Sequence, residues 1–184
     1  VPFTPQAPTG NWDQLHNEAC EEASTIMAAA YFTGDTRSRI PAAEVESQIT
    51  ALTNWEQVRL GYFLDNTVDE TAEMIRSFYK LKASVVEDFT EDDIKEALRA
   101  NKIVILSVNG RKLGNPYYKQ PGPIYHMLVV RGYTATQLIT NDPGTKNGEN
   151  YPYSFSTIKN APADWDHSRD TIDESRSLMI VVSK

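Results

Sequence analysis

The hydrophobic periodicity of the chain changes after Ala100, and this change limits the folds open to it. Before that point, apolar residues mostly recur three or four positions apart, which is typical of helices with one buried face. After it, short runs rich in Val, Ile and Leu are separated by Gly, Pro and Asn, which is typical of strands and turns. Because helices come first and strands second, the sequence predicts an α+β fold with an N-terminal helical half packed on a C-terminal antiparallel sheet.

Individual elements follow from the same pattern. Helices are expected over Glu18–Tyr31 with Asn17 as its cap, from Pro41 through Leu52, over Thr67–Leu81 and over Glu91–Ala100, the last with a capping box of Thr90 and Asp93. Strands are expected at Lys82–Glu87, Ile103–Val108, Tyr125–Tyr133, Gln137–Asn141 and Ser177–Ser183, with an antiparallel hairpin around Thr134–Thr136. Trp55–Leu64 is ambiguous between helix and loop. Loops are expected at Asn109–Pro123, Gly144–Asn150 and Pro162–Ser175.

The length of 184 residues suits a single domain over 1–184, in which the Pro-rich residues 1–12 form an extended N-terminal segment. The chain starts at Val1 without an initiator methionine, which suggests a processed form and favours a secreted or cell-envelope protein over a cytoplasmic one. The net charge of −7, without a Lys/Arg-rich run, argues against nucleic acid as a partner. No apolar stretch has the length of a membrane span. The sequence leaves the oligomeric state open.

Cys20 is the only cysteine of the chain, and it stands where a helix is expected to begin. A free thiol has a pKa of about 8.5. The unpaired N–H groups and the positive end of the helix dipole stabilise the thiolate form. Downstream, His126 lies in an apolar strand and Asp142 ends the next one. Cys, His and Asp on predictable elements are the pattern of a thiol hydrolase. Gln14, six residues before Cys20, is expected to supply an oxyanion amide beside the Cys20 N–H.

These residues resemble the papain-like cysteine peptidases, and more narrowly the compact bacterial peptidase C39-like family. The resemblance covers roughly residues 12–158 and is carried by the spacing of Gln14 and Cys20, by the run from Tyr125 to Tyr133 and by Asn-Asp-Pro at 141–143. It implies a papain-like fold, with Cys20 as nucleophile, His126 as general base and acid, Asp142 as orienting residue and Gln14 as oxyanion donor. One departure is the acidic surroundings of Cys20, where Glu18, Glu21 and Glu22 replace the small residues usual in the family.

The predicted function is therefore a cysteine peptidase that hydrolyses peptide or protein substrates through a thioester, without a metal or organic cofactor. Tyr117, Tyr118 and Tyr125 are expected to line its cleft. Two alternatives stay open: an inactive papain-like module that binds peptides or proteins, and an acyl or amide transferase that uses the same thiol. A zinc site at His16 and Cys20 is not predicted, because two ligands four residues apart lack the further ligands that such sites use.

Overall fold

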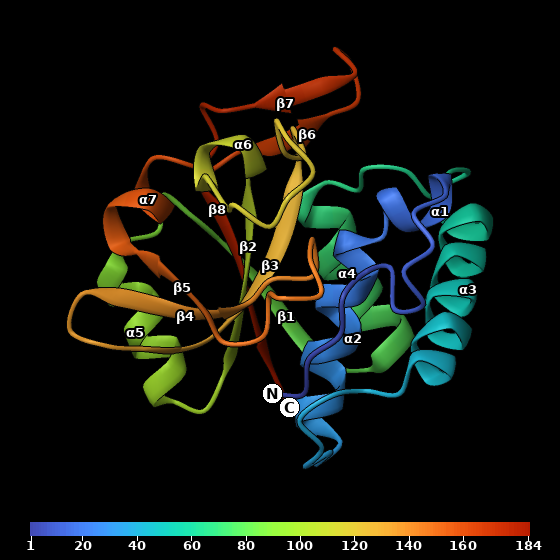
Figure 1. Ribbon diagram of the computed structural model, residues 1–184, viewed down its shortest axis with the longest axis horizontal. Coiled ribbons are helices and arrows are strands. Elements are labelled where there is room, and N and C mark those ends of the chain that lie inside the picture. The colour runs from blue at the N-terminus through green and yellow to red at the C-terminus, as the bar shows by residue number, and fades with distance from the viewer.

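The computed structural model, which describes residues 1–184, consists of a group of helices that lies against a sheet (Figure 1). Four helices come first in the chain: α1 (Gln14–Asn17), α2 (Cys20–Phe32), α3 (Ala42–Arg59) and α4 (Val68–Tyr79). Three shorter ones follow among the strands: α5 (Glu91–Arg99), α6 (Gly110–Leu113) and α7 (Phe155–Lys159). Helices therefore precede most of the sheet in sequence, and the predicted α+β class is confirmed.

The strands form one six-stranded antiparallel sheet in the order β1-β8-β2-β3-β4-β5, and a separate pair, β6 and β7. They are β1 (Lys82–Glu87), β2 (Ile103–Val108), β3 (His126–Tyr133), β4 (Gln137–Asn141), β5 (Tyr151–Ser154), β6 (Asp164–Asp166), β7 (Thr171–Asp173) and β8 (Leu178–Ser183). The predicted hairpin is the β3–β4 pair. The strand β2 lies between β8 and β3, so a strand from the end of the chain completes the middle of the sheet.

Both faces of the sheet are buried, because alternate side chains along β3 point into two different hydrophobic cores. Met127 and Val129 belong to the core beneath α2 and α4, whereas Leu128 and Val130 belong to the core beneath α5 and α7. His126 precedes Met127 and therefore falls on the second face, where its ring lies against that of Tyr118. The structure thus places an imidazole at the start of β3, directly before four buried apolar residues.

The start of α2 differs from the prediction. Asn17 does not cap it, because a separate short helix, α1, occupies these residues and is capped by Asp13, whose carboxylate accepts the His16 N–H at 3.0 Å. The helix α2 begins at Cys20 after Ala19, without any side-chain cap. Its first internal backbone hydrogen bond runs from Ala23 to Ala19, so the N–H of Cys20 is left for another acceptor.

Other boundaries follow local chemistry more closely. The helix α3 continues to Arg59, so the first part of the ambiguous segment Trp55–Leu64 is helical, and Pro41 precedes α3 as its cap. The helix α5 begins with the predicted capping box, in which Thr90 accepts the Asp93 N–H and Asp93 accepts the Thr90 N–H.

Sequence reasoning missed the short elements of the second half. The strand β5 contains Pro152, which is tolerated because β5 is the edge of the sheet. The expected loop Pro162–Ser175 holds β6 and β7, and its Asp164 is fully buried. The expected loop Asn109–Pro123 holds α6. Elements of three to five residues are too short to show a hydrophobic period.

The N-terminal segment bridges the helices and the sheet. Phe3 is buried and exchanges backbone hydrogen bonds with the stretch before α3, at 2.8 Å to Ser38 O and 3.0 Å from Ile40 N. The Gln6 N–H then donates to the carbonyl of Pro143, just after β4. These bonds bring residues 3–6 to the place where α2 faces β3. No helix of the chain is both long and apolar enough to cross a lipid bilayer.

Candidate active site

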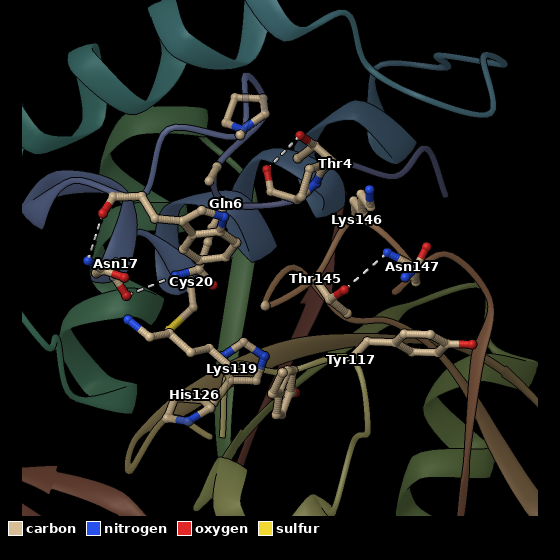
Figure 2. A pocket seen from close by; sticks show the side chains of 18 of the residues that line it. Thr4, Gln6, Asn17, Cys20, Tyr117, Lys119, His126, Thr145, Lys146 and Asn147 are labelled. Atoms are coloured by element: carbon tan, nitrogen blue, oxygen red, sulfur yellow. Dashed lines mark hydrogen bonds between the residues drawn. The ribbon is translucent and has the colours of Figure 1, made fainter. Parts of the chain in front are cut away.

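Cys20 and His126 come from opposite sides of the contact between helices and sheet. Cys20 is the first residue of α2 and His126 the first residue of β3. The backbone N–H of Met127 donates to the Cys20 sulfur at 3.3 Å. The sulfur therefore contacts the residue directly after His126, and both side chains border the same pocket (Figure 2).

His126 is paired with Asp142. Its Nε2 lies 2.8 Å from Asp142 Oδ1, and both side chains are almost completely buried. An ionised carboxylate only accepts hydrogen bonds, so Nε2 carries the proton of this pair and Nδ1 is the nitrogen available to a second partner. The pair does not arise from directly opposed residues, because the β3–β4 register sets Val129 against Asn141. Asp142 follows the end of β4, and its side chain turns back toward the start of β3.

Four further donors hold the Asp142 carboxylate. The hydroxyls of Tyr118 and Tyr153 each donate to Oδ2 at 2.6 Å, and the Asn115 amide donates to the same oxygen at 3.2 Å. The Gly144 N–H donates to Oδ1 at 3.0 Å. Burial by itself raises the pKa of Asp142, but the adjacent imidazole and these hydroxyls outweigh it and lower the pKa below its usual value. Asp142 is therefore an ionised carboxylate fixed in one position.

Gly144 is required by close packing around the imidazole. A Cβ atom at this position would lie 2.8 Å from the Tyr118 ring and 3.0 Å from Cε1 of His126. The Asn-Asp-Pro-Gly sequence at 141–144 therefore does more than form a turn. It lets the backbone approach the histidine and gives Asp142 one of its donors.

The thiol itself faces a carboxyl group. The Cys20 Sγ–H donates to Glu21 Oε2 at 3.0 Å, while Glu21 Oε1 accepts the backbone N–H of Asn66 at 3.1 Å. Burial, followed by the negative charge and hydrogen bonding of Glu21, raises the pKa of the Cys20 thiol well above its usual value; only the Met127 N–H acts in the opposite direction. In this arrangement the thiol is neutral.

Glu21 is one of several buried carboxyl groups behind the sulfur. Glu22 and Glu56 lie next to each other, and Asn66 donates from its side chain to Glu56. Burial raises the pKa of Glu21 and Glu22 well above the usual value, with added repulsion from neighbouring carboxylates, and raises that of Glu56 to about 7. Burial and repulsion from Glu18 raise the pKa of Asp65 to about 7 as well. Of the acidic residues around Cys20, Glu21 and Glu22 therefore face inward, whereas Glu18 is half-buried.

A cavity of about 1090 Å³ opens over Cys20 and His126. The three tyrosines expected at the cleft all border it. Only Tyr117 is exposed, at 55%. The Tyr118 hydroxyl is engaged by Asp142, and the Tyr125 hydroxyl donates to the Asn66 carbonyl at 2.8 Å. Tyr118 and Tyr125 therefore shape the wall with their rings, and Tyr117 is the one that offers a free surface.

The structure does not bring Gln14 to this cavity. Gln14 is exposed on α1 and is absent from the cavity wall, whereas Gln6 is buried and forms part of that wall. The Gln6 Nε2 donates to the carbonyl of His16 at 2.8 Å and to that of Asn17 at 2.9 Å, in the turn that leads into Cys20. Figure 2 shows Gln6 and Asn17 side by side at the pocket. Its Oε1 has no partner. Sequence reasoning did not place Gln6 at the cavity. Phe3 could have indicated it, because a large apolar residue in the Pro-rich segment is expected to be buried and to hold that segment against the rest of the chain.

His16 has partners of its own. Its Nδ1 lies 2.7 Å from Asp13 and its Nε2 lies 2.9 Å from Glu46, so both ring nitrogens are engaged by carboxylates. His167, the third histidine, contacts Glu70 at 2.9 Å on the surface. Of the three imidazoles, only that of His126 borders the cavity with the cysteine.

Comparison with known proteins agrees with this architecture. Residues 1–172 match the Peptidase_C39 like family. The crystal structure of a Bacillus anthracis protein described as a C39-like peptidase is similar over 100% of this chain and 94% of that chain, with a TM-score of 0.62 and 16% sequence identity, a likeness of fold. No curated protein shows significant similarity to the sequence. The family match begins before residue 12, so it includes the segment that carries Gln6.

Proposed function

Because this chain belongs to the peptidase C39-like family, we propose that it is a cysteine peptidase in which the Cys20 sulfur attacks the carbonyl carbon of a peptide bond. The observation that carries this proposal is the buried pair of His126 and Asp142, 2.8 Å apart, at the pocket that also contains Cys20. A fixed carboxylate on Nε2 keeps Nδ1 unprotonated and directed to other partners, which is what a general base for the thiol requires.

The first half-reaction forms a thioester. His126 Nδ1 takes the thiol proton, and the sulfur bonds to the carbonyl carbon. The negative oxygen of the tetrahedral intermediate accepts the free N–H of Cys20 at the start of α2. His126 then gives its proton to the leaving amine as the C–N bond breaks. Throughout these transfers Asp142 stays ionised and stabilises the imidazolium.

The second half-reaction releases the acid. A water molecule gives a proton to His126, adds to the thioester carbonyl, and expels the Cys20 thiolate, which recovers the proton. We assign the second oxyanion donor to Gln6, the buried amide on the pocket wall. One of its N–H groups must exchange its bond to the Asn17 carbonyl for a bond to the oxyanion.

Glu21 imposes a condition on this mechanism. The thiol hydrogen of Cys20 is hydrogen-bonded to Glu21. The S–H group must therefore rotate from that carboxyl group toward His126 before the sulfur is activated. The raised pKa of Cys20 favours a resting enzyme with a neutral thiol. The same observation favours the second candidate function, a papain-like module that binds peptides without cleaving them.

Alkylation of the single cysteine distinguishes the two functions. We expect iodoacetamide to label the wild-type protein at neutral pH considerably faster than the His126→Ala variant, because only the former can remove the thiol proton. Unfolded protein substrates should be cleaved by the wild type and by neither His126→Ala nor Cys20→Ser. Equally slow labelling of the wild type and His126→Ala, together with no cleavage, would instead identify the binding module.

A further inference from the structure

The cavity over Cys20 differs in charge from the rest of the molecule. The chain has 25 acidic and 18 basic residues and a net charge of −7. Yet no Asp or Glu borders the cavity, whereas three basic residues do: Arg39, Lys119 and Lys146. Glu21 and Glu22, which directly follow Cys20, are buried and do not border the cavity. An acidic protein therefore has a basic substrate cleft.

One of the three cations is already neutralised. Arg39 pairs with Glu149 at 2.8 Å and donates to the Lys146 carbonyl at 3.1 Å. Its guanidinium also lies over the Phe3 ring, 4.9 Å from the ring centre. Arg39 is thus a structural link between the N-terminal segment and the loop after β4.

The ammonium groups of Lys119 and Lys146 are different, because neither has a hydrogen-bond or ion-pair partner in the chain. Other lysines do, such as Lys95 with Glu91 and Lys112 with Glu174 at 2.7 Å. Lys119 precedes the histidine strand and Lys146 follows the Asp142 turn, and Figure 2 shows them on different sides of the pocket. Two unpaired cations therefore flank the cavity that contains Cys20 and His126.

We propose that the cleft selects acidic peptides, with Lys119 and Lys146 binding carboxylate side chains of the substrate on either side of the bond that faces Cys20. This inference rests on the proposed function and names its substrate class. A cleft lined by one sign of charge concentrates ligands of the opposite sign. Because both lysines are exposed, each contact is modest, about two- to fivefold in affinity, and weakens with salt.

Binding to the Cys20→Ala protein tests the inference without requiring cleavage. Two fluorescent peptide libraries are compared by anisotropy, one with Asp and Glu at alternate positions and one with Asn and Gln in their place. We expect the acidic library to bind about tenfold more tightly at low salt, and this preference to disappear at high salt. Equal affinity of the two libraries, or no binding of either, contradicts the inference.

Matched variants locate the effect. In the Cys20→Ala background, Lys119→Gln with Lys146→Gln should abolish the preference for the acidic library. Lys102→Gln with Lys159→Gln removes the same charge from exposed lysines outside the cavity and should leave the preference intact. An equal loss in both pairs would mean that only net charge matters, and would overturn the assignment to Lys119 and Lys146.

Failure of this inference can be told apart from failure of the proposed function. If the active protein cleaves both libraries equally well and binds them equally, it is a peptidase without the acidic preference. The opposite result is also distinguishable. In it, the Cys20→Ala protein prefers acidic peptides, while the wild-type protein neither cleaves them nor reacts rapidly with iodoacetamide at Cys20. In that case the cleft is a binding site for acidic peptides and the peptidase proposal is wrong.

Discussion

Glu21 is the side chain that most changes the chemistry of the candidate nucleophile. A helix start lowers the pKa of a thiol, but here a buried carboxyl group accepts the thiol hydrogen at 3.0 Å. Burial and this carboxyl group together raise the pKa of Cys20, so they outweigh the helix start. The residue that follows the cysteine therefore regulates how readily the thiolate forms.

Replacing Glu21 by Gln should make Cys20 more reactive. The amide keeps an acceptor for the Asn66 N–H, removes the negative charge and offers the sulfur an N–H donor, so we expect the pKa of Cys20 to fall. The rate of alkylation by iodoacetamide, measured against pH, should shift toward lower pH. Glu96→Gln, an exposed change on α5, is the control. A profile for Glu21→Gln that coincides with the wild type would show that burial alone sets the thiol pKa.

Gln6 and Gln14 give a second test at the scale of single residues. If Gln6 donates to the oxyanion, Gln6→Ala should lower kcat on a peptide substrate by about 10²- to 10³-fold, whereas Gln14→Ala should change it little. Because Gln6 is buried, the rate of Cys20 alkylation is measured in parallel to verify that the site is intact. A large loss of kcat in Gln14→Ala instead would restore the role expected for it from its spacing to Cys20.

At the scale of elements, the position of Asp142 depends on two segments that meet at the end of β4. Asn115 and Tyr118 come from the loop before β3, and Tyr153 comes from β5. The strand β5 pairs with β4, with Leu138 opposite Tyr153, which brings the tyrosine hydroxyl to the carboxylate. A strand that sequence reasoning missed therefore supports the candidate triad.

The contribution of β5 is tested by removing one hydroxyl. Tyr153→Phe deletes a 2.6 Å hydrogen bond to Asp142, and we expect a loss of about 1.5–3 kcal/mol in the free energy of unfolding, because the acceptor is charged and buried. Activity should also decrease, since the pKa of Asp142 rises and His126 is held less firmly. Tyr151→Phe, on the same strand and without a hydrogen bond to Asp142, should alter neither quantity. Urea unfolding and peptide hydrolysis measure the two effects.

At the scale of the whole molecule, the buried carboxyl groups make stability depend on pH. In the folded chain Glu56 and Asp65 have pKa values of about 7, and those of Glu21 and Glu22 are also raised. Unfolded carboxyl groups release their protons near pH 4. Between about pH 4 and 7 the folded state therefore binds more protons, and its stability falls as pH rises. The lowered pKa of Asp142 makes stability rise with pH instead, but this effect is confined to solutions more acidic than about pH 4.

We expect the free energy of unfolding to be larger at pH 5 than at pH 8, by an amount on the order of 2 kcal/mol. Glu56→Gln keeps the acceptor for Asn66 and cannot ionise, so it should raise stability at pH 8 and reduce this difference. Urea titrations at the two pH values measure both effects, with Glu96→Gln as the exposed control. Equal stability at pH 5 and 8, or an unchanged slope in Glu56→Gln, would mean that these carboxyl groups are solvated.

Much of the architecture follows from neighbouring residues. Some features depend only on residues a few positions apart, so the sequence predicts them. They are the capping box at Thr90 and Asp93, the apolar runs of β2 and β3, and the hairpin to β4. The order of Cys20, His126 and Asp142 along the chain also predicts the thiol, imidazole and carboxylate of the candidate site, and the family match supports the same architecture.

Only the tertiary structure decided which groups surround the thiol. Gln6 reaches the cavity because Phe3 is buried and the Gln6 N–H bonds to Pro143, and Glu21 turns inward because Asn66 lies behind it. These contacts join residues from 45 to 137 positions apart. A hydrophobic period or a capping pattern covers only neighbouring residues, so it cannot predict contacts between residues this far apart in sequence. These contacts form when the helices pack against the sheet and each buried polar group must find a partner.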